Sequence, residues 1–195
     1  APRMIDAVQG LPDHLPHSTF RNISMPSFAV SPRDGSMVVV WADMRRGNAD
    51  IYEANSTNGG ATWSVPIRVN HDSPLDGKDQ FQPEVAAAPN GTFYCSWFDR
   101  RWDPNNYLID VAIAESSNDG ASFGPNIRVT KHSWDPAIGA PVPDKGDTFI
   151  GDYQALVADN NGAQPLWNDT QNGTSQQIRT AFVTTAVFRA ALRKR

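Results

Sequence analysis

Three stretches of the chain repeat one order of apolar and polar positions: a short apolar run, a polar turn, a second apolar run and Trp-x-Asp. They read PSFAVSPRDGSMVVVWAD at 26–43, PEVAAAPNGTFYCSWFD at 83–99 and DYQALVADNNGAQPLWND at 152–169. Each polar turn contains Asp-Gly or Asn-Gly, residue pairs that accept the positive φ of a tight hairpin. Each stretch therefore predicts two antiparallel strands.

Further runs after each Trp-x-Asp extend the unit. We expect a third strand over 50–55, 109–114 and 177–182, and a fourth over 66–70 and 126–130. In the third unit the fourth strand is absent or replaced by 186–193, which fits either a strand or a short helix. Four antiparallel strands that recur along a chain are typical of the blades of a β-propeller.

A second motif lies between the third and fourth strands of the first two units. Both copies follow Ser-x-Asn-x-Gly-x-(Ser/Thr)-aromatic, at Ser56, Asn58, Gly60 and Trp63, and again at Ser116, Asn118, Gly120 and Phe123. A short polar side chain can hydrogen-bond the amides of its own turn, and glycine allows backbone geometry closed to other residues. The aromatic residue is expected to cap the apolar layer of the blade.

These two motifs resemble the Asp-box of sialidases and related propellers, with asparagine in place of the usual aspartate. The resemblance covers roughly residues 20–184 and implies an all-β partial propeller of about three four-stranded blades with Asp-box hairpins. The segments would be an irregular 1–20, in which 4–8 could form an outer strand, and then blades at 21–75, 76–145 and a partial one at 146–195. Propellers close with about four to eight blades, so we expect either part of a longer chain or a half-ring completed by a second copy.

Charge and apolar patterning argue against two classes of partner. The 195 residues include 17 Lys and Arg against 21 Asp and Glu, and the longest basic cluster is the C-terminal 193–195. Because nucleic-acid binding needs clustered positive charge, we expect no such partner. No apolar run is long enough to span a bilayer, so we expect no membrane insertion.

Cysteine, histidine and the asparagine sequons add little chemistry. Cys95 lies inside a predicted strand and reads as a buried structural thiol. His14 and His17 have metal-ligand spacing, but in a Pro-rich segment that favours plain surface exposure. We expect a secreted or extracellular protein, although the first residues lack the order of a signal peptide. Sequons begin at Asn22, Asn55, Asn90, Asn168 and Asn172, but Asn, Gly and Thr are common in turns, so chance explains these sequons better than glycosylation does.

Candidate ligand-binding residues precede or begin the innermost strands, which surround the central channel at one mouth of a propeller. They are Asp79, Gln80, Gln82, Asp152 and Tyr153. Such oxygen-rich positions could line a glycan or protein site or hold calcium, although solvated loops are the commoner role, and no cofactor is required. Tyr153 and Asp152 form a Tyr-acid pair, but adjacent strand residues point to opposite faces, so Asp152 should not assist Tyr153.

Arg45 is a further candidate. It follows Trp41-Ala-Asp43, and Arg101 stands in the same place after Trp97-Phe-Asp99. An acid and a guanidinium that recur in successive blades more often tie a loop together than perform chemistry, since an active site is formed once.

The resemblance to sialidases implies a test for catalysis. In that family three arginines bind the substrate carboxylate, the first of them in an Arg-Ile-Pro motif, and a Glu-assisted Tyr and an Asp perform the chemistry. Here Ser24 stands where the first arginine would be, and Arg21 is about ten ångströms away along an extended chain. This position does not support hydrolysis.

Three functions stay open from the sequence. The favoured one is a non-catalytic sialidase-like module that binds glycan or protein at the channel mouth. The second is part of a sialidase-type glycoside hydrolase whose remaining residues lie in further blades. The third is a structural module that completes a ring by self-association. Fold similarity alone does not choose among them.

Overall fold

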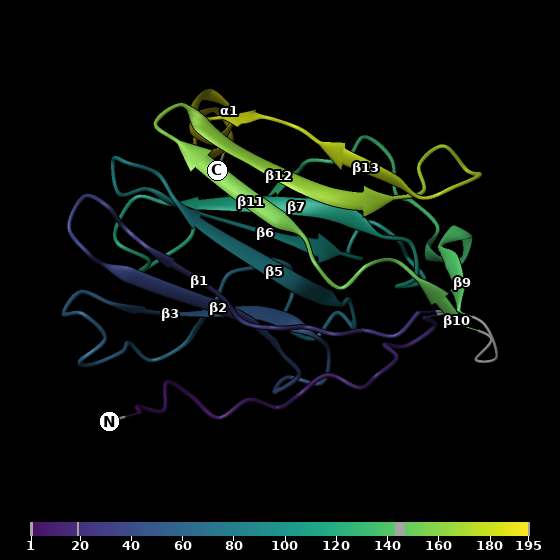
Figure 1. The fold of residues 1–195 in the computed structure, drawn as a ribbon, viewed down its shortest axis with the longest axis horizontal. Coiled ribbons are helices and arrows are strands. Elements are labelled where there is room, and N and C mark those ends of the chain that lie inside the picture. Colours follow the sequence, from purple (N-terminus) through teal and green to yellow (C-terminus); the bar gives the residue numbers. More distant parts are fainter. Residues whose placement is uncertain (1, 19, 143–146, 195) are drawn as a thin grey trace.

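Three antiparallel sheets follow one another along the chain and fan outward from a shared inner edge (Figure 1). This computed structural model describes residues 2–18, 20–142 and 147–194. The first two sheets have four strands in the order β1-β2-β3-β4 and β5-β6-β7-β8, and the third contains β11-β12-β13. The fold is the all-β partial propeller that the repeats predict.

Blades 1 and 2 follow the predicted unit closely. Blade 1 consists of β1 (Ser27–Val30), β2 (Met37–Asp43), β3 (Asp50–Ser56) and β4 (Ile67–Arg68). Blade 2 consists of β5 (Gln80–Ala87), β6 (Phe93–Asp99), β7 (Asp110–Ser116) and β8 (Ile127–Arg128). Their first hairpins turn at Gly35 and Gly91, whose φ values of 75° and 87° explain why glycine stands there.

Blade 3 departs from the pattern in its last strand. It contains β11 (Ala155–Asp159), β12 (Gly162–Asp169), β13 (Gln177–Thr180) and β14 (Val183–Thr184). β14 pairs with β12 beyond the end of β13, so it does not add a fourth strand outside β13. The run after it forms helix α1 (Thr185–Leu192), which buries Phe188 against Tyr94 of blade 2 at a ring separation of 5.5 Å. The helical alternative for 186–193 is therefore correct.

A connecting segment with short elements of its own joins blades 2 and 3. It contains the 3-10 turn η1 (Pro136–Ile138) and a two-stranded ribbon of β9 (Ala140–Val142) and β10 (Asp147–Phe149). The blade boundary expected at residues 145 and 146 lies outside the described residues.

The inner strands β1, β5 and β11 lie side by side, so each blade packs one face on the next. Between blades 1 and 2 the core includes Val38, Val40, Ile51, Phe93, Cys95 and Trp97. Between blades 2 and 3 it includes Tyr94, Ile113, Ala163, Val183 and Phe188. Burial of this apolar surface is the main force that holds the blades together.

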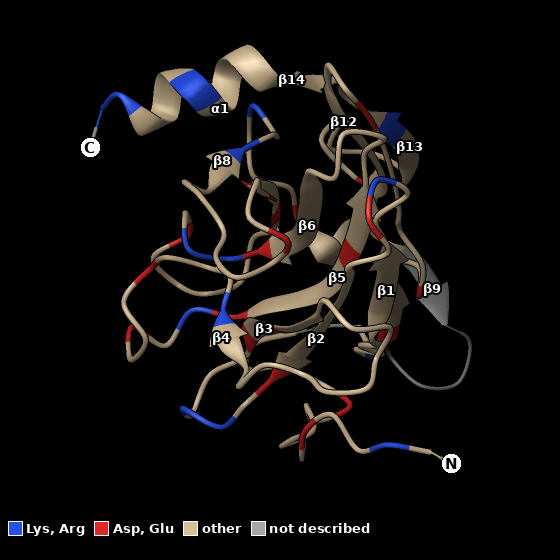
Figure 2. Ribbon diagram, turned by 90° about the vertical axis from the view of Figure 1, so that its left-hand side faces the viewer, with Lys and Arg blue, Asp and Glu red and all other residues tan. Residues whose placement is uncertain are grey.

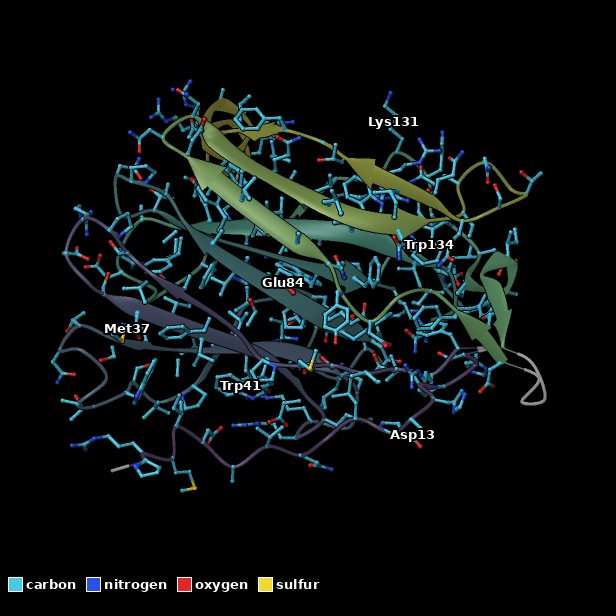
Figure 3. The ribbon with its side chains drawn as sticks, viewed as in Figure 1. Asp13, Met37, Trp41, Glu84, Lys131 and Trp134 are labelled. Carbon is cyan, nitrogen blue, oxygen red and sulfur yellow. The ribbon has the colours of Figure 1, made fainter. Side chains whose placement is uncertain are left out.

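The N-terminal segment runs along the face of blade 1 that points away from blade 2 (Figure 2). The strand expected at 4–8 is wrong, because this segment crosses the face of a sheet and finds no free strand edge to pair with. Ile5 packs on the cluster of Val39, Trp41, Tyr52 and Ala54. Trp41 lies on this side of the blade (Figure 3).

Both Asp-box-like turns have one geometry. In the first, Asn58 Oδ1 accepts from the Ser56 hydroxyl at 2.9 Å and from the Thr62 amide at 2.9 Å, while the Gly60 amide donates to the Ser56 hydroxyl at 3.0 Å. The second turn repeats the three bonds at 2.9, 3.1 and 3.1 Å. Gly60 and Gly120 have φ values of 77° and 90°, as their role in the turn predicted.

Candidate functional site at the channel mouth

A small hollow with both polar and apolar walls lies near the start of the three inner strands. Its walls come from all three blades: Met25, Pro26, Ser27, Gln82, Pro83, Glu84, Asp152, Tyr153 and Gln154. It encloses about 100 Å³, less than a typical small-molecule pocket, so it can hold one edge of a ligand while the rest lies in the open. Figure 3 shows Glu84 at the inner edge of blade 2, in the middle of the molecule.

Gln82 is the central residue of this mouth and ties the blades together. A β-bulge between Phe81 and Glu84 places it at φ 49°, a left-handed conformation that is uncommon for a side chain of this size. Its Nε2 donates to the carbonyl of Gly151 at 3.2 Å, and its own carbonyl accepts from Gln154 at 3.1 Å. Strained backbone of this kind is concentrated at functional sites.

Two carboxylates face the mouth from different blades. Glu84 accepts from the Ser27 hydroxyl at 2.8 Å, and burial raises its pKa despite that bond. Asp152 Oδ2 accepts from Arg21 at 2.7 Å, and the Arg21 guanidinium lies 5.7 Å from the ring centre of Phe149. Arg21 thus neutralises one acid from outside the hollow, and the residues that line the hollow include two acids and no base.

Two acceptor atoms at the mouth are buried without a donor among the residues described: Asp152 Oδ1 and Gln154 Oε1. Leaving a buried acceptor unsatisfied costs about 1–3 kcal/mol, so a local shift that brought a hydroxyl donor to either oxygen would be favoured. Beside them, the side chain of Tyr153 is 74% exposed. Because Asp152 is engaged by Arg21, it is not positioned to activate Tyr153.

Asp79 and Gln80, by contrast, do not reach the mouth. Asp79 is 1% exposed and accepts from the Ala49 amide at 2.9 Å and from Asn106 at 2.6 Å. It lines a different hollow of about 700 Å³, which shares no residue with the mouth. Gln80 is fully buried and belongs to a network between blades 1 and 2.

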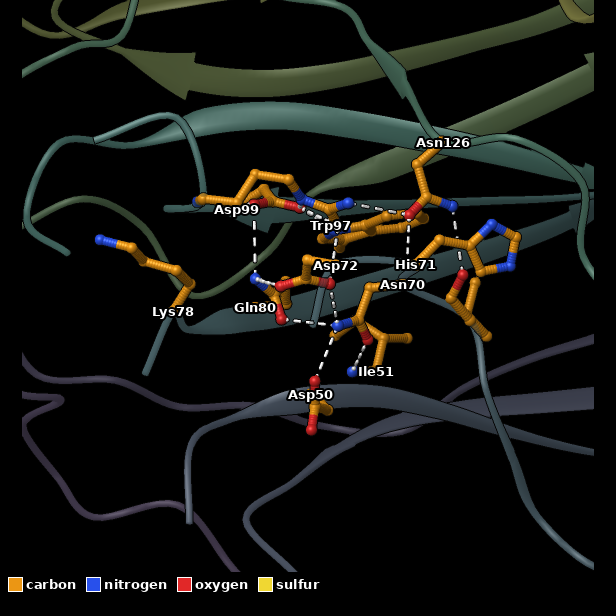
Figure 4. Close-up of polar contacts among 12 residues, drawn as sticks. Asp50, Ile51, Asn70, His71, Asp72, Lys78, Gln80, Trp97, Asp99 and Asn126 are labelled. Atoms are coloured by element: carbon orange, nitrogen blue, oxygen red, sulfur yellow. Dashed lines mark hydrogen bonds and ion pairs between the residues drawn. The ribbon is translucent and has the colours of Figure 1, made fainter. Parts of the chain in front are cut away.

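That network joins loops of both blades (Figure 4). Asn70 donates to Asp50 at 2.7 Å and to the Gln80 carbonyl oxygen at 2.7 Å, and Gln80 donates to Asp72 at 3.0 Å. Asp99 completes it through a longer contact of 3.4 Å. Apart from Asp50 Oδ2, which has no partner among the described residues, these polar groups satisfy one another, so their evident role is to hold the loop that contains Asn70 and Asp72 against the strand ends.

Arg45 also has a structural position. Its Nη2 contacts Asp43 and Asp6, each at 2.5 Å, and its guanidinium lies 4.5 Å from the ring centre of Tyr52. It thus clamps the N-terminal segment onto blade 1. The Trp-x-Asp motif repeats its own bond in every blade, with indole-to-carboxylate distances of 3.3, 2.7 and 2.9 Å.

The sequence interpretation missed Glu84 as a mouth residue and did not give Arg21 a partner. The signal for Glu84 was an acid in the interior of a predicted innermost strand, at Pro83-Glu84-Val85. The Ser24 hydroxyl accepts a hydrogen bond from the Gln82 amide at 3.3 Å. Ser24 stands where a sialidase would have its first arginine, and here it supports the bulge.

Metal and membrane sites find no support in the described part of the chain. It contains no group of three His, Cys, Asp or Glu side chains that could hold a metal ion. His14 contacts Asp147 at 3.1 Å rather than forming a metal-binding pair with His17. No helix of residues 2–18, 20–142 and 147–194 is long and apolar enough to cross a membrane.

Comparison with known proteins finds solved structures that share the fold of this chain. No family model matches the chain, and no curated protein matches it. A GH93 α-L-arabinofuranosidase of Fusarium graminearum in complex with arabinobiose superposes with a TM-score of 0.57 at 17% identity, covering 83% of this chain and 45% of that one. An α-L-arabinanase of Penicillium chrysogenum complexed with arabinobiose gives 0.53 at 18%, covering 87% and 47%.

These likenesses show the propeller fold, and the chain spans about half the length of the proteins it matches. A Hadza microbial sialidase gives a TM-score of 0.40 at 15% identity, covering 80% of this chain and 42% of that one.

Proposed function

We propose that this chain is a glycan-binding propeller module whose ligand site is the channel mouth, and that it binds without cleaving. One observation carries the proposal. The inner strands of three blades converge on one hollow where buried acceptors lack donors and an exposed aromatic side chain stands beside them. Sugars offer both hydroxyl donors and apolar ring faces, so they match this arrangement.

The charge of the mouth favours a neutral sugar over an anionic one. Glu84 and Asp152 line the hollow, and the nearby Arg21 is already paired with Asp152. A ligand carboxylate would meet two acids and no free guanidinium, so it would be repelled. The similar arabinanase and arabinofuranosidase structures hold arabinobiose, a neutral disaccharide, which supports the same class. An extracellular location, where such glycans occur, is part of the proposal.

Calorimetric titration with arabinobiose and with sialyllactose tests this. We expect weak binding of arabinobiose, none of sialyllactose, and at least tenfold weaker binding in Tyr153→Ala and Gln82→Ala. Asn105→Ala is the matched control, because Asn105 is exposed and lines the separate 700 Å³ hollow. Equal loss in the control, or a preference for sialyllactose, would contradict the proposal.

A second candidate function is that of part of a glycoside hydrolase, in which this chain supplies the general acid. Glu84 favours it, because a half-buried carboxyl group with a raised pKa at a sugar-sized mouth suits proton donation to a leaving group. Hydrolysis of nitrophenyl arabinofuranoside separates the two functions. The binding module predicts no turnover by the wild type, whereas turnover that disappears in Glu84→Gln would favour the hydrolase.

A further inference from the structure

A larger hollow lies next to the mouth. It encloses about 530 Å³ and is lined by residues 13–14, 21–23, Asp147 and Phe149; we call it the Asn22 hollow. Its volume falls within the range typical of small-molecule sites, whereas the 100 Å³ of the mouth does not. The Asn22 hollow therefore has room for whole sugar rings, while the mouth holds one edge of a ligand.

The mouth and the Asn22 hollow draw on the same two segments of chain, 20–27 and 147–154. The two segments run parallel where Phe20 and Thr148 form a parallel bridge. The Asn22 hollow lies at the first residues of both segments and the mouth at their last residues. The separation is about four residues, which is at most about 14 Å of chain. A short oligosaccharide can therefore reach from one hollow to the other.

Asn22 carries two unused hydrogen-bonding groups in the wall of this hollow. The residue is 6% exposed, and neither its Oδ1 nor its Nδ2 has a partner among the described residues. Buried polar groups without partners are destabilising, whereas adjacent sugar hydroxyls can donate to the oxygen and accept from the nitrogen. Because both atoms are buried in the wall, the Asn22 amide has to turn toward the hollow to meet a ligand.

The charged groups of the Asn22 hollow fit a neutral ligand that is rich in hydroxyl groups. Asp147 contacts His14 at 3.1 Å, and Arg21 is held by Asp152 of the mouth at 2.7 Å. Asp13 adds a further, exposed carboxylate. Carboxylates accept hydrogen bonds from sugar hydroxyls and repel an anionic ligand. The pair of Arg21 and Asp152 joins the walls of the two hollows, so both favour the same class of ligand.

We propose that the Asn22 hollow is an additional sugar subsite, so that the chain binds an oligosaccharide along 20–27 and 147–154. The inference rests on the proposed function, since it needs the first sugar units to be anchored at the mouth beside the exposed Tyr153. In the Asn22 hollow the ring of Phe149 lies under the Arg21 guanidinium, so a lone disaccharide gains less contact there. The subsite therefore adds affinity for ligands long enough to extend from the mouth.

Calorimetric titration of the full chain with arabinobiose and with arabinopentaose tests the subsite. We expect the wild type to bind arabinopentaose about tenfold more tightly than arabinobiose, the scale of one added hydrogen bond. Asn22→Ala and Asp147→Ala should remove most of this gain and leave the affinity for arabinobiose unchanged, whereas Tyr153→Ala should weaken binding of both sugars. Asn105→Ala, in the separate 700 Å³ hollow, is the matched control and should behave like the wild type. Circular dichroism should show unchanged folding in every variant.

The outcomes separate the subsite from the proposed function. Equal affinity of the wild type for the two sugars, or a gain that persists in either Asn22→Ala or Asp147→Ala, would overturn the subsite and leave the mouth as a binding site. No binding of either sugar, or binding that Tyr153→Ala does not weaken, would overturn the proposed function and the subsite with it.

Amide chemical shifts of the intact chain give a second measurement. Arabinopentaose should shift residues 13–14, 21–23 and 147–149 in addition to those of the mouth, whereas arabinobiose should shift mainly those of the mouth. Changes that stay confined to the mouth at saturating arabinopentaose would overturn the subsite.

Discussion

The two Asp-box-like glycines offer a matched pair of substitutions with unequal expected effects. Both have left-handed backbone, so alanine is strained at either position. At Gly60 an added Cβ would meet its nearest neighbours, Met37 and Trp63, at 3.7 and 3.8 Å, which is ordinary contact. At Gly120 it would lie 2.5 Å from Val38 Cγ2 and 2.8 Å from Asn55 Cβ, both in blade 1.

These distances set the magnitudes. Left-handed strain alone should make Gly60→Ala about 1–2 kcal/mol less stable than the wild type. Gly120→Ala adds the forced separation of blades 1 and 2, and overpacking of this kind costs a further 1–3 kcal/mol or so. We therefore expect Gly120→Ala to lose about 2–5 kcal/mol in all, more than Gly60→Ala.

Urea unfolding followed by tryptophan fluorescence measures the difference. The slope of the unfolding free energy against urea concentration should be the same for the wild type and both variants, and the midpoint urea concentration should fall furthest for Gly120→Ala. Equal midpoints for the two variants, or a lower one for Gly60→Ala, would refute the argument that the second turn is wedged against blade 1.

Two other predictions concern ionisation and catalysis. Glu53 is 1% exposed, both its carboxylate oxygens lack a donor among the described residues, and burial raises its pKa to about 8. The folded protein therefore holds a proton that the unfolded chain releases near pH 4.5, so wild-type stability should fall between about pH 4.5 and 8, by up to about 1.4 kcal/mol per pH unit. Glu53→Gln should lack this slope in urea titrations at pH 5 and 8; parallel behaviour would contradict the assignment. For catalysis, a fluorogenic sialoside should show no turnover from pH 4 to 8. Sialoside cleavage needs an arginine cluster beside the nucleophile and the acid, and the described residues that line the mouth include no arginine. Turnover that is lost in Tyr153→Ala would contradict this prediction.

Local chemistry made the blades predictable. Hydrogen bonds between residues close in sequence determine the Trp-x-Asp motif and the Asn-Gly and Asp-Gly turns; Trp97, for example, donates to Asp99 at 2.7 Å. The spacing of these motifs therefore predicts the strands. The N-terminal segment has no such period, since it covers blade 1 through a few separate contacts. The run 186–193 is short and almost wholly apolar, so it shows the period of neither a strand nor a helix; in the structure it forms α1, which buries Phe188.

The site was less predictable because side-chain direction depends on distant partners. Asp79 turns to Asn106, which is 27 residues away, and Gln80 turns to Asn70. The bulge at Gln82 interrupts the alternation of side chains along β5, so the direction of this side chain does not follow from strand periodicity. Of the predicted set, Gln82, Asp152 and Tyr153 lie together at the mouth, joined by Glu84.

Mapping of amide chemical shifts in the intact chain during titration with arabinobiose tests the central claim most directly. The proposed site predicts that the largest changes cluster at 25–27, 82–84 and 152–154, the three inner-strand starts that surround the mouth. Largest changes around Asp76, Asn105 and Asn106 in the separate hollow, or no changes at saturating sugar, would contradict it.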